Sequence, residues 1–369
     1  MNFELTSAQR TTHDAARALG DLLLRRADEL VATSVLPPDL QTELAERRWL
    51  VATLSQELGG AGLDWVASVG LVEELSRAGG WVGLLAGLQV ALAEAIVHQG
   101  RDEQREAYVK PLAKGELLLS LVHGESIAGS RALTATPVDE GWRLEGAVPS
   151  VAGALQAEAF VVVITTAEGG AQCWLVPKGT SGLLLEGEGD ATWAPGRVCF
   201  ERCVLPASTE LGTSSKRSFM AEILARLRLV AAAHAVGVAR RAFEAALEAL
   251  APELDPSGSG SEQAASLVLA EMATRVDAAR LLTFHAADAL SSEAATAGVL
   301  GGEGDSAAAA KLYASTTATW VTERAEQLCA FAGDRSLFAT QRRLAWSSQR
   351  IGGDSDRLRE RIGRTALGL

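Results

Sequence analysis

The sequence predicts an α+β fold in which helices, strands and helices follow one another as separate blocks. Apolar residues recur at three- and four-residue steps up to about Lys114 and again from Ser218 onward, which is typical of helices. Between Glu116 and about Gly212 the pattern changes to short alternating runs interrupted by Gly and Pro, as in antiparallel strands. Segregated elements of this kind define the α+β class. We therefore expect an N-terminal helical domain (1–114), a middle antiparallel β-domain (115–213) and a C-terminal four-helix bundle (214–369).

The individual elements follow from the same patterns. In the first block, helices are expected over 15–32, 38–46, 68–78 and 82–98, separated by Pro37-Pro38 and by the glycine-rich stretch 58–63. The β-block contains apolar runs at 142–145, 160–165, 172–176 and 198–200. Helices return over 220–250, 263–290, 307–331 and 357–367. The stretches 256–261 and 298–304, rich in Gly and Ser or Gly alone, are expected to be flexible connections.

Composition and charge exclude several classes of protein. A chain of 369 residues with 48% hydrophobic residues can bury a large core. Its formal net charge of −12 argues against nucleic-acid binding, which needs a basic surface. We find no apolar run of membrane-spanning length and no basic-then-apolar leader, so we expect a soluble, cytoplasmic protein. The scattered histidines and the cysteine spacing argue against a metal site and fit a reducing compartment.

Generic motifs say little about the chemistry. The sequence has no dinucleotide-binding G-x-G-x-x-G after a strand, no phosphate-binding G-x-x-x-x-G-K-[ST] and no G-x-S-x-G nucleophile motif. Longer stretches are more informative, because six of them occur in a fixed order along the chain. They are Gly115-Glu116-Leu117 with 121–130, Trp174-Leu-Val-Pro-Lys178, 198–206 with Leu211-Gly212, 228–237, Lys311-Leu-Tyr-Ala-Ser315 with Gln327-Leu328, and 362–368.

In these stretches the chain resembles an acyl-CoA dehydrogenase-type flavoprotein over nearly its whole length. The first stretch is similar to the family's G-E-L and T-E-P-G-A-G-S segments, and the last to its I-I-G-R-x-L-L-G tail. The divergent motifs most resemble dehydrogenases that make hydroxymalonyl- or methoxymalonyl-acyl carrier protein extender units in polyketide pathways. The resemblance implies FAD at the junction of the β-domain and the C-terminal helices, in a homodimer or homotetramer. It also implies that a carboxylate removes a Cα proton while Cβ delivers hydride to the flavin.

The resemblance assigns site residues position by position. Those expected beside the flavin are Leu121, His123, Gly124, Gly129, Ser130, Ser150, Ala152, Gln327, Gly353 and Asp354. Those expected at the substrate are Ser130, Arg228, Ile351 and Gly352. Gly124 stands in place of a flavin-binding threonine, Ser150 in place of a tryptophan that covers the ring, and Ala152 in place of a second hydroxyl. Gln327 fits either a contact to FAD across an interface or an ordinary surface glutamine.

Further departures concern the loops and the base. The family's R-x-x-F-G loop is replaced by the stretch 256–261, and its G-G-x-G by 329–333. The catalytic glutamate of the family's Y-E-G-T-S-E is replaced by Gly352, and the alternative position on the central helix holds Leu227. Asp354 is the first candidate for a substitute base; the other reading is that it caps the last helix. Nearby arginines either meet phosphate or are exposed helix charges: Arg350, Arg357, Arg359 and Arg361.

Three hypotheses remain open at this point. The first is a flavin oxidoreductase acting on a small, hydroxylated acyl thioester of acyl carrier protein or CoA, since a hydroxyl-bearing carbon moves the proton to be removed from Cα to O–H. The second is a flavin-dependent monooxygenase on the same fold, which needs no Cα base. The third is a scaffold that has lost its flavin, as the substitutions at Gly124, Ser150 and Ala152 would allow.

Overall fold

The computed structural model describes residues 4–123, 133–165, 171–187, 193–212, 216–250, 260–291, 303–329 and 336–368 of the chain. The chain divides into two compact units. The helical unit contains Met1–Glu29, Asp64–Leu84 and Leu224–Leu369, and the sheet unit contains Leu30–Leu63 and Leu85–Ile223. Each unit carries some of the residues that the sequence assigns to the site.

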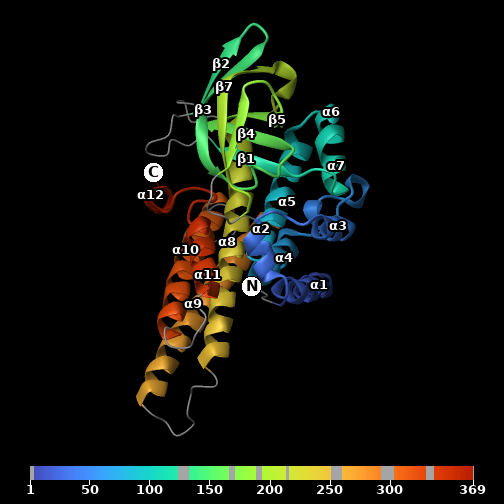
Figure 1. The fold of residues 1–369 in the computed structure, drawn as a ribbon. Coiled ribbons are helices and arrows are strands. Elements are labelled where there is room, and N and C mark those ends of the chain that lie inside the picture. Colours follow the sequence, from blue (N-terminus) through green and yellow to red (C-terminus); the bar gives the residue numbers. More distant parts are fainter. Residues whose placement is uncertain are drawn as a thin grey trace. The chain divides into compact units, whose positions relative to one another are not determined.

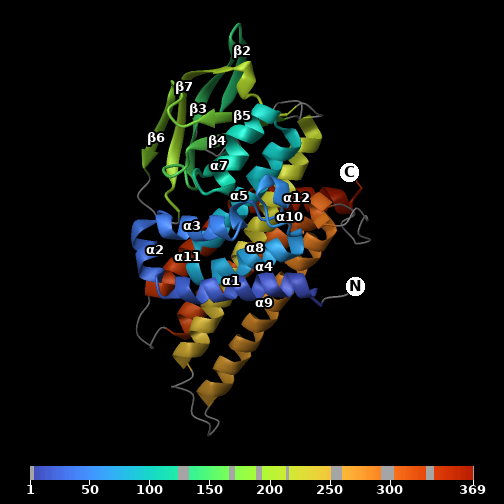
Figure 2. The same cartoon turned by 90° about the vertical axis from the view of Figure 1, so that its right-hand side faces the viewer.

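The helical unit is built mainly from long helices. They are α1 (Ser7–Leu24), α4 (Trp65–Gly79), most of α8 (Lys216–Leu250), α9 (Gly260–Ser291), α10 (Glu303–Leu328), α11 (Ser336–Ser348) and α12 (Ser355–Ala366). α1 begins at a capping box in which the Thr6 hydroxyl accepts from Gln9 N and Thr6 N donates to the Gln9 side chain. α1 lies along α4 (Figure 2), and α10 packs against α9, α11 and α12.

α4 is buried along almost its whole length, including two carboxylates. Glu73 and Glu74 are 1% and 0% exposed. Arg240 of α8 places Nη1 2.7 Å from Glu74 Oε1, and Arg77 Nε lies 2.9 Å from Glu74 Oε2. Arg280 of α9 places Nε 2.9 Å from Glu73 Oε1. Because buried charges need compensating charges nearby, this buried ion cluster (Glu73, Glu74, Arg77, Arg240 and Arg280) ties α4 to α8 and α9.

The sheet unit combines short helices with two β-sheets (Figure 1). One sheet has the strand order β1-β4-β5 and the other β2-β3-β7-β6. The strands are β1 (Leu119–His123), β2 (Thr134–Val138), β3 (Gly141–Val151), β4 (Ala159–Thr165), β5 (Ala171–Pro177), β6 (Leu183–Gly187) and β7 (Gly196–Pro206). The helical elements are α3 (Pro38–Glu46), α5 (Trp81–Gln99, from Leu85 onward), α6 (Asp102–Gln104), α7 (Lys110–Ala113), η1 (Trp49–Val51), η2 (Gln56–Leu58), η3 (Arg105–Val109) and η4 (Ala207–Thr209). The boundary between the two units falls within α2 (Ala27–Thr33), after Glu29.

Buried side chains of both sheets form one apolar cluster. It includes Phe160 of β4, Trp174 of β5 and Phe200 of β7. Trp142 of β3 meets Trp174 edge to face, with ring centroids 5.6 Å apart. Because side chains alternate along a strand, one face of each strand fills this core and the other is left for different contacts.

The α+β class and the order helices, strands, helices are confirmed. The antiparallel β-domain needs one correction, because β1 and β4 run parallel while the other four strand pairs are antiparallel. Alternating residues indicate that a segment is a strand but not the direction of its partner. The domain boundaries at 114 and 213 stay a prediction.

Three helical details also differ from the expectations. The helix expected over 15–32 is interrupted, since α1 ends at Leu24 and α2 starts at Ala27. α11 was not expected at all. α5 meets the length and hydropathy of a membrane span, contrary to the expectation that no run does, but 89% of its apolar window is buried inside the fold. The connections expected at 256–261 and 298–304 lie mostly outside the described residues, and their last residues begin α9 and α10.

Candidate functional site

The segment that the sequence assigns to the reacting carbon is a turn between α11 and α12. We call it the 349–354 turn. It contains two consecutive glycines with positive φ, 74° at Gly352 and 111° at Gly353. Residues with a Cβ rarely adopt such angles. The backbone therefore favours glycine at the position where the resemblance places the family's glutamate.

Arg228 of α8 contacts this turn directly. Its Nε donates to Gly352 O at 3.0 Å, and its side chain is buried. A Cβ placed on Gly352 would lie 3.0 Å from Arg228 Cγ, 3.1 Å from its Cα and 3.2 Å from its N. Two of these atoms belong to the backbone of a long helix and cannot easily move. A side chain at position 352 would therefore strain the backbone and force Arg228 to shift by a few tenths of an ångström.

Lys311 of α10 contacts the same turn. Its Nζ donates to Gln349 O at 2.6 Å and to Gly353 O at 2.8 Å. Burial lowers the pKa of Lys311 to about 8; the Asp354 carboxylate acts in the opposite direction, and Arg228 and Arg359 add to the lowering. In the sequence Lys311 is only part of the Lys311–Ser315 motif, to which no role in the site was assigned. No local pattern could have shown its contacts, because its partners lie 38 and 42 residues away.

Asp354 is the N-cap of α12. Its carboxylate accepts from Asp356 N at 2.8 Å, and its side chain is exposed. The structure therefore shows the capping role that was the alternative to a base. A role as base stays a prediction. At the second position that the family uses for a base, Leu227 is buried within α8.

The sheet unit brings together two of the segments expected at the flavin. Ser120 Oγ of β1 donates to Ala152 O at 2.7 Å, so residues 121–123 lie beside residues 150–152. Leu121, His123 and Ala152 are half-buried and Ser150 is exposed, while the residues between them are buried. Ser150 has φ 51°, a left-handed conformation that is uncommon for a residue with a Cβ.

The remaining predicted residues are placed differently. Gln327 is exposed on α10, and its Oε1 accepts from Arg324 Nη1 at 2.6 Å. Ile351 is half-buried in the 349–354 turn. Gly124, Gly129 and Ser130 lie outside the described residues, as does most of the stretch 329–333.

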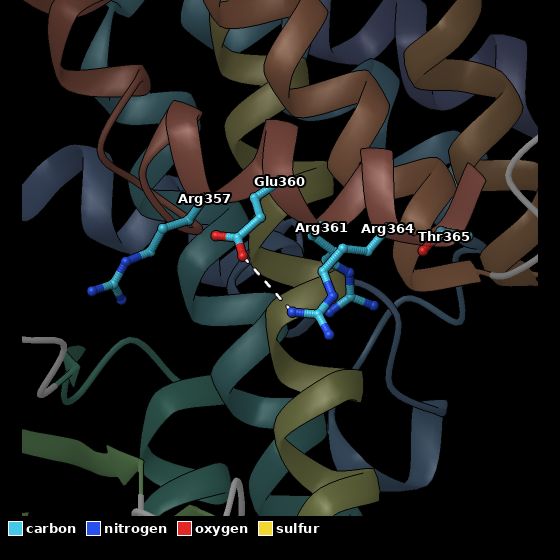
Figure 3. Close-up of a pocket in the computed structure, with 5 residues that line it drawn as sticks. All are labelled: Arg357, Glu360, Arg361, Arg364 and Thr365. Atoms are coloured by element: carbon cyan, nitrogen blue, oxygen red, sulfur yellow. Dashed lines mark ion pairs between the residues drawn. The ribbon is translucent and has the colours of Figure 1, made fainter. Parts of the chain in front are cut away.

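α12 carries a shallow hollow on its surface (Figure 3). Arg357, Glu360, Arg361, Arg364 and Thr365 line it. Figure 3 shows Glu360 pointing toward Arg364, and Glu360 Oε1 lies 3.8 Å from Arg364 Nη1. Arg361 Nε lies 2.7 Å from Asp305 Oδ1 of α10. Carboxylates therefore neutralise much of the positive charge, and the hollow is a weak site for a polyanion.

The chemistry of the described residues fits a flavin and offers no metal site. Leu121 and Ala152 provide apolar contacts and His123 and Ser150 provide hydrogen-bonding groups, a mixture typical of cofactor sites. Within the part of the chain that the structure describes, no group of three or more His, Cys, Asp or Glu side chains could hold a metal ion.

Two protein-family models match the chain. The N-terminal domain of acyl-CoA dehydrogenases matches residues 6–116, and their C-terminal domain matches residues 217–367. The short-chain specific acyl-CoA dehydrogenase of Homo sapiens mitochondria is 30% identical over 76% of this chain and 70% of its own length. Benzylmalonyl-CoA dehydrogenase of Aromatoleum aromaticum is 28% identical over 93% of each chain.

Solved structures show the same similarity. Butyryl-CoA dehydrogenase from Megasphaera elsdenii superimposes with a TM-score of 0.87 at 25% identity, over 100% of both chains. An FAD complex of PigA, at 22% identity and a TM-score of 0.87 over 100% of both chains, shares the fold.

Proposed function

Because the chain belongs to the acyl-CoA dehydrogenase family of FAD-dependent oxidoreductases that act on acyl thioesters, we propose that it oxidises a small, hydroxylated acyl thioester. In this proposal the acyl group is carried by acyl carrier protein or CoA and becomes a polyketide extender unit. The enzyme acts as a homodimer or homotetramer in the cytoplasm.

The absence of a carboxylate at position 352, within a turn that disfavours a side chain, carries this proposal. A Cα proton of a thioester is weakly acidic and needs a base held against it. Gly352 cannot be such a base, and Arg228 occupies the space next to it. A hydroxyl proton is more acidic, so it can pass to water or to an exposed carboxylate such as Asp354. Oxidation of a carbinol carbon then breaks its C–H and O–H bonds and leaves a carbonyl.

The charges at the 349–354 turn support the same reaction. Two cationic side chains contact the turn, Arg228 through Gly352 O and Lys311 through Gln349 O and Gly353 O. Positive charge near a reacting oxygen stabilises a transition state in which that oxygen becomes negative. When bound, FAD supplies the acceptor for a hydride. The relative named benzylmalonyl-CoA dehydrogenase supports a malonyl-type acyl group, because its name describes a substituted malonyl thioester.

The site residues have the following roles in this proposal. Leu121, His123, Ser150, Ala152, Gln327, Gly353 and Asp354 lie beside the flavin, together with Gly124, Gly129 and Ser130. Arg228, Ile351, Gly352 and Ser130 lie at the substrate. Arg228 orients the acyl thioester, and the substrate hydroxyl lies against the 349–354 turn, where the resemblance places the family's carboxylate.

Anaerobic flavin bleaching tests the proposal. The purified protein is mixed with matched pairs of thioesters, hydroxylated and saturated, each on acyl carrier protein and on CoA. We expect a flavin absorbance band that the hydroxylated member bleaches at least about tenfold faster, which corresponds to about 1.4 kcal/mol of barrier. Equal bleaching by the saturated member contradicts the proposal. Bleaching only by an external reductant favours a monooxygenase, and absence of flavin favours a scaffold.

A further inference from the structure

Lys311 is fully buried although it carries a charge. Its side chain is 0% exposed. A buried ammonium group is costly unless acceptors bind its protons, and here the acceptors are two carbonyl oxygens of the 349–354 turn, at 2.6 and 2.8 Å. These charge-assisted hydrogen bonds tie α10 to the turn.

The turn needs such support because of its sequence. Gly352 and Gly353 have no side chains with which to pack, and glycine loses more conformational freedom on folding than any other residue. Arg228 binds the carbonyl of Gly352 and Lys311 binds the carbonyl of Gly353. Cations from two different helices therefore fix two consecutive peptide groups whose φ angles are 74° and 111°.

We propose that Lys311 is a positioning residue for the reaction, which acts through Gln349 O and Gly353 O to hold the 349–354 turn in the conformation that receives the acyl thioester. This role depends on the proposed function in one respect only, namely that the 349–354 turn lies at the substrate. It does not depend on which acyl group is oxidised. Lys311 itself does not touch the substrate.

The charges around Lys311 make this role sensitive to pH. The charged groups that act on it are the Asp354 carboxylate, Arg228 of α8 and Arg359 of α12. Burial, Arg228 and Arg359 lower its pKa and Asp354 raises it, with a result of about 8. Above this pH the ammonium group loses its charge, and its two hydrogen bonds to the turn lose their charge assistance.

Amide hydrogen exchange tests the structural step without any substrate. We expect Lys311→Met to accelerate exchange of the backbone amides of residues 351–355 by about 10- to 100-fold, the size of a lost charged hydrogen bond. The matched control is Val321→Ala, which removes buried volume from the same helix further along its length and leaves both Lys311 hydrogen bonds in place. Exchange in Lys311→Met that equals exchange in Val321→Ala overturns the inference.

The pH dependence of flavin reduction tests the functional step. With any thioester that bleaches the flavin, we expect the wild-type rate to fall above about pH 8. Asp354→Asn keeps a capping side chain but removes the negative charge, so the fall should move to lower pH. Arg359→Gln removes a positive charge, so the fall in rate should move to higher pH. A fall that stays in place in both variants overturns the role of Lys311. If no thioester bleaches the flavin, the proposed function fails. Amide exchange alone then tests whether Lys311 holds the 349–354 turn.

Discussion

Arg228 Cα lies 3.1 Å from the point where a Cβ on Gly352 would stand, and Arg228 Nε donates to Gly352 O at 3.0 Å. A glutamate restored at this position should therefore strain the turn and press against Arg228. We predict that Gly352→Glu neither gains activity on a saturated acyl thioester nor keeps wild-type stability. Flavin bleaching and urea unfolding measure the two effects.

The contribution of Arg228 can be separated from backbone strain with a matched pair. Gly352→Ala should destabilise the fold by about 2–5 kcal/mol, from a left-handed backbone and from overlap with Arg228. Gly62 has φ 68° but open space around its Cβ position. Gly62→Ala should therefore cost only the backbone strain, about 1–2 kcal/mol. Equal losses in the two variants would show that Arg228 does not exclude a side chain.

The buried ion cluster should make the helical unit sensitive to acid. Burial alone would raise the pKa of Glu74, but His13, Arg240 and Arg77 outweigh it and hold that pKa far below its usual value of 4.5. A depressed carboxyl pKa gives stability that is present above the unfolded pKa and is lost as pH falls below it. We expect urea midpoints to drop below about pH 4.5, and Glu74→Gln to remove this part of the drop.

At pH 7 the same substitution should be costly. Glu74→Gln removes the buried partner of Arg77 and one of the two buried partners of Arg240, and breaking a buried pair typically costs about 3–5 kcal/mol. Glu43 provides the control, because its pair with Arg47 has side chains that are 37% and 36% exposed. Glu43→Gln should change the free energy of unfolding by less than about 1 kcal/mol. A similar small loss in Glu74→Gln would contradict the prediction.

His234 should produce a second acid transition at higher pH. It is fully buried, with Nδ1 3.1 Å from Ser76 Oγ, and burial lowers its pKa to about 4 from 6.5. The unfolded chain binds the proton more tightly, so stability falls as pH drops from about 6.5 towards 4. His234→Leu should flatten this part of the urea-midpoint profile, whereas replacing the exposed His98 by Gln should leave the slope as it is in the wild type.

Gln89 should control the strand that carries two of the predicted flavin contacts. β1 is an edge strand, and the buried Gln89 amide binds both Leu119 N at 2.8 Å and Leu119 O at 3.0 Å. Gln89→Leu leaves both groups buried and unpaired, which costs about 1–3 kcal/mol for each. We expect a lower melting temperature together with weaker FAD binding, measured by flavin content after dialysis.

The control for Gln89 is an equivalent amide elsewhere in the sheet unit. Gln156 accepts from Leu36 N at 2.9 Å and donates to Leu36 O at 3.0 Å. Gln156→Leu should lower the melting temperature similarly but keep FAD binding closer to that of the wild type. If both variants lose flavin equally, β1 has no special role in holding it.

Periodicity and the order of the motifs were enough to predict the class of the fold, the order of its elements and the family. Helical and strand periodicities are local, so α3 and most of α9 and α10 could be read directly from apolar spacing. α11 was not predicted because its burial does not follow its apolar pattern: the polar Gln341 is 5% exposed, whereas the apolar Trp346 is 65% exposed. The parallel pairing of β1 with β4 was not predicted because the alternation of apolar and polar residues does not indicate the direction of the neighbouring strand.

The consequence of the missing glutamate depends on how distant segments pack together. The sequence showed that position 352 holds glycine, but not that Arg228, 124 residues earlier in the chain, fills the space beside it. It likewise gave no role to Lys311, whose partners are backbone carbonyls. Contacts of this kind depend on how distant helices pack, and neither composition nor periodicity records them.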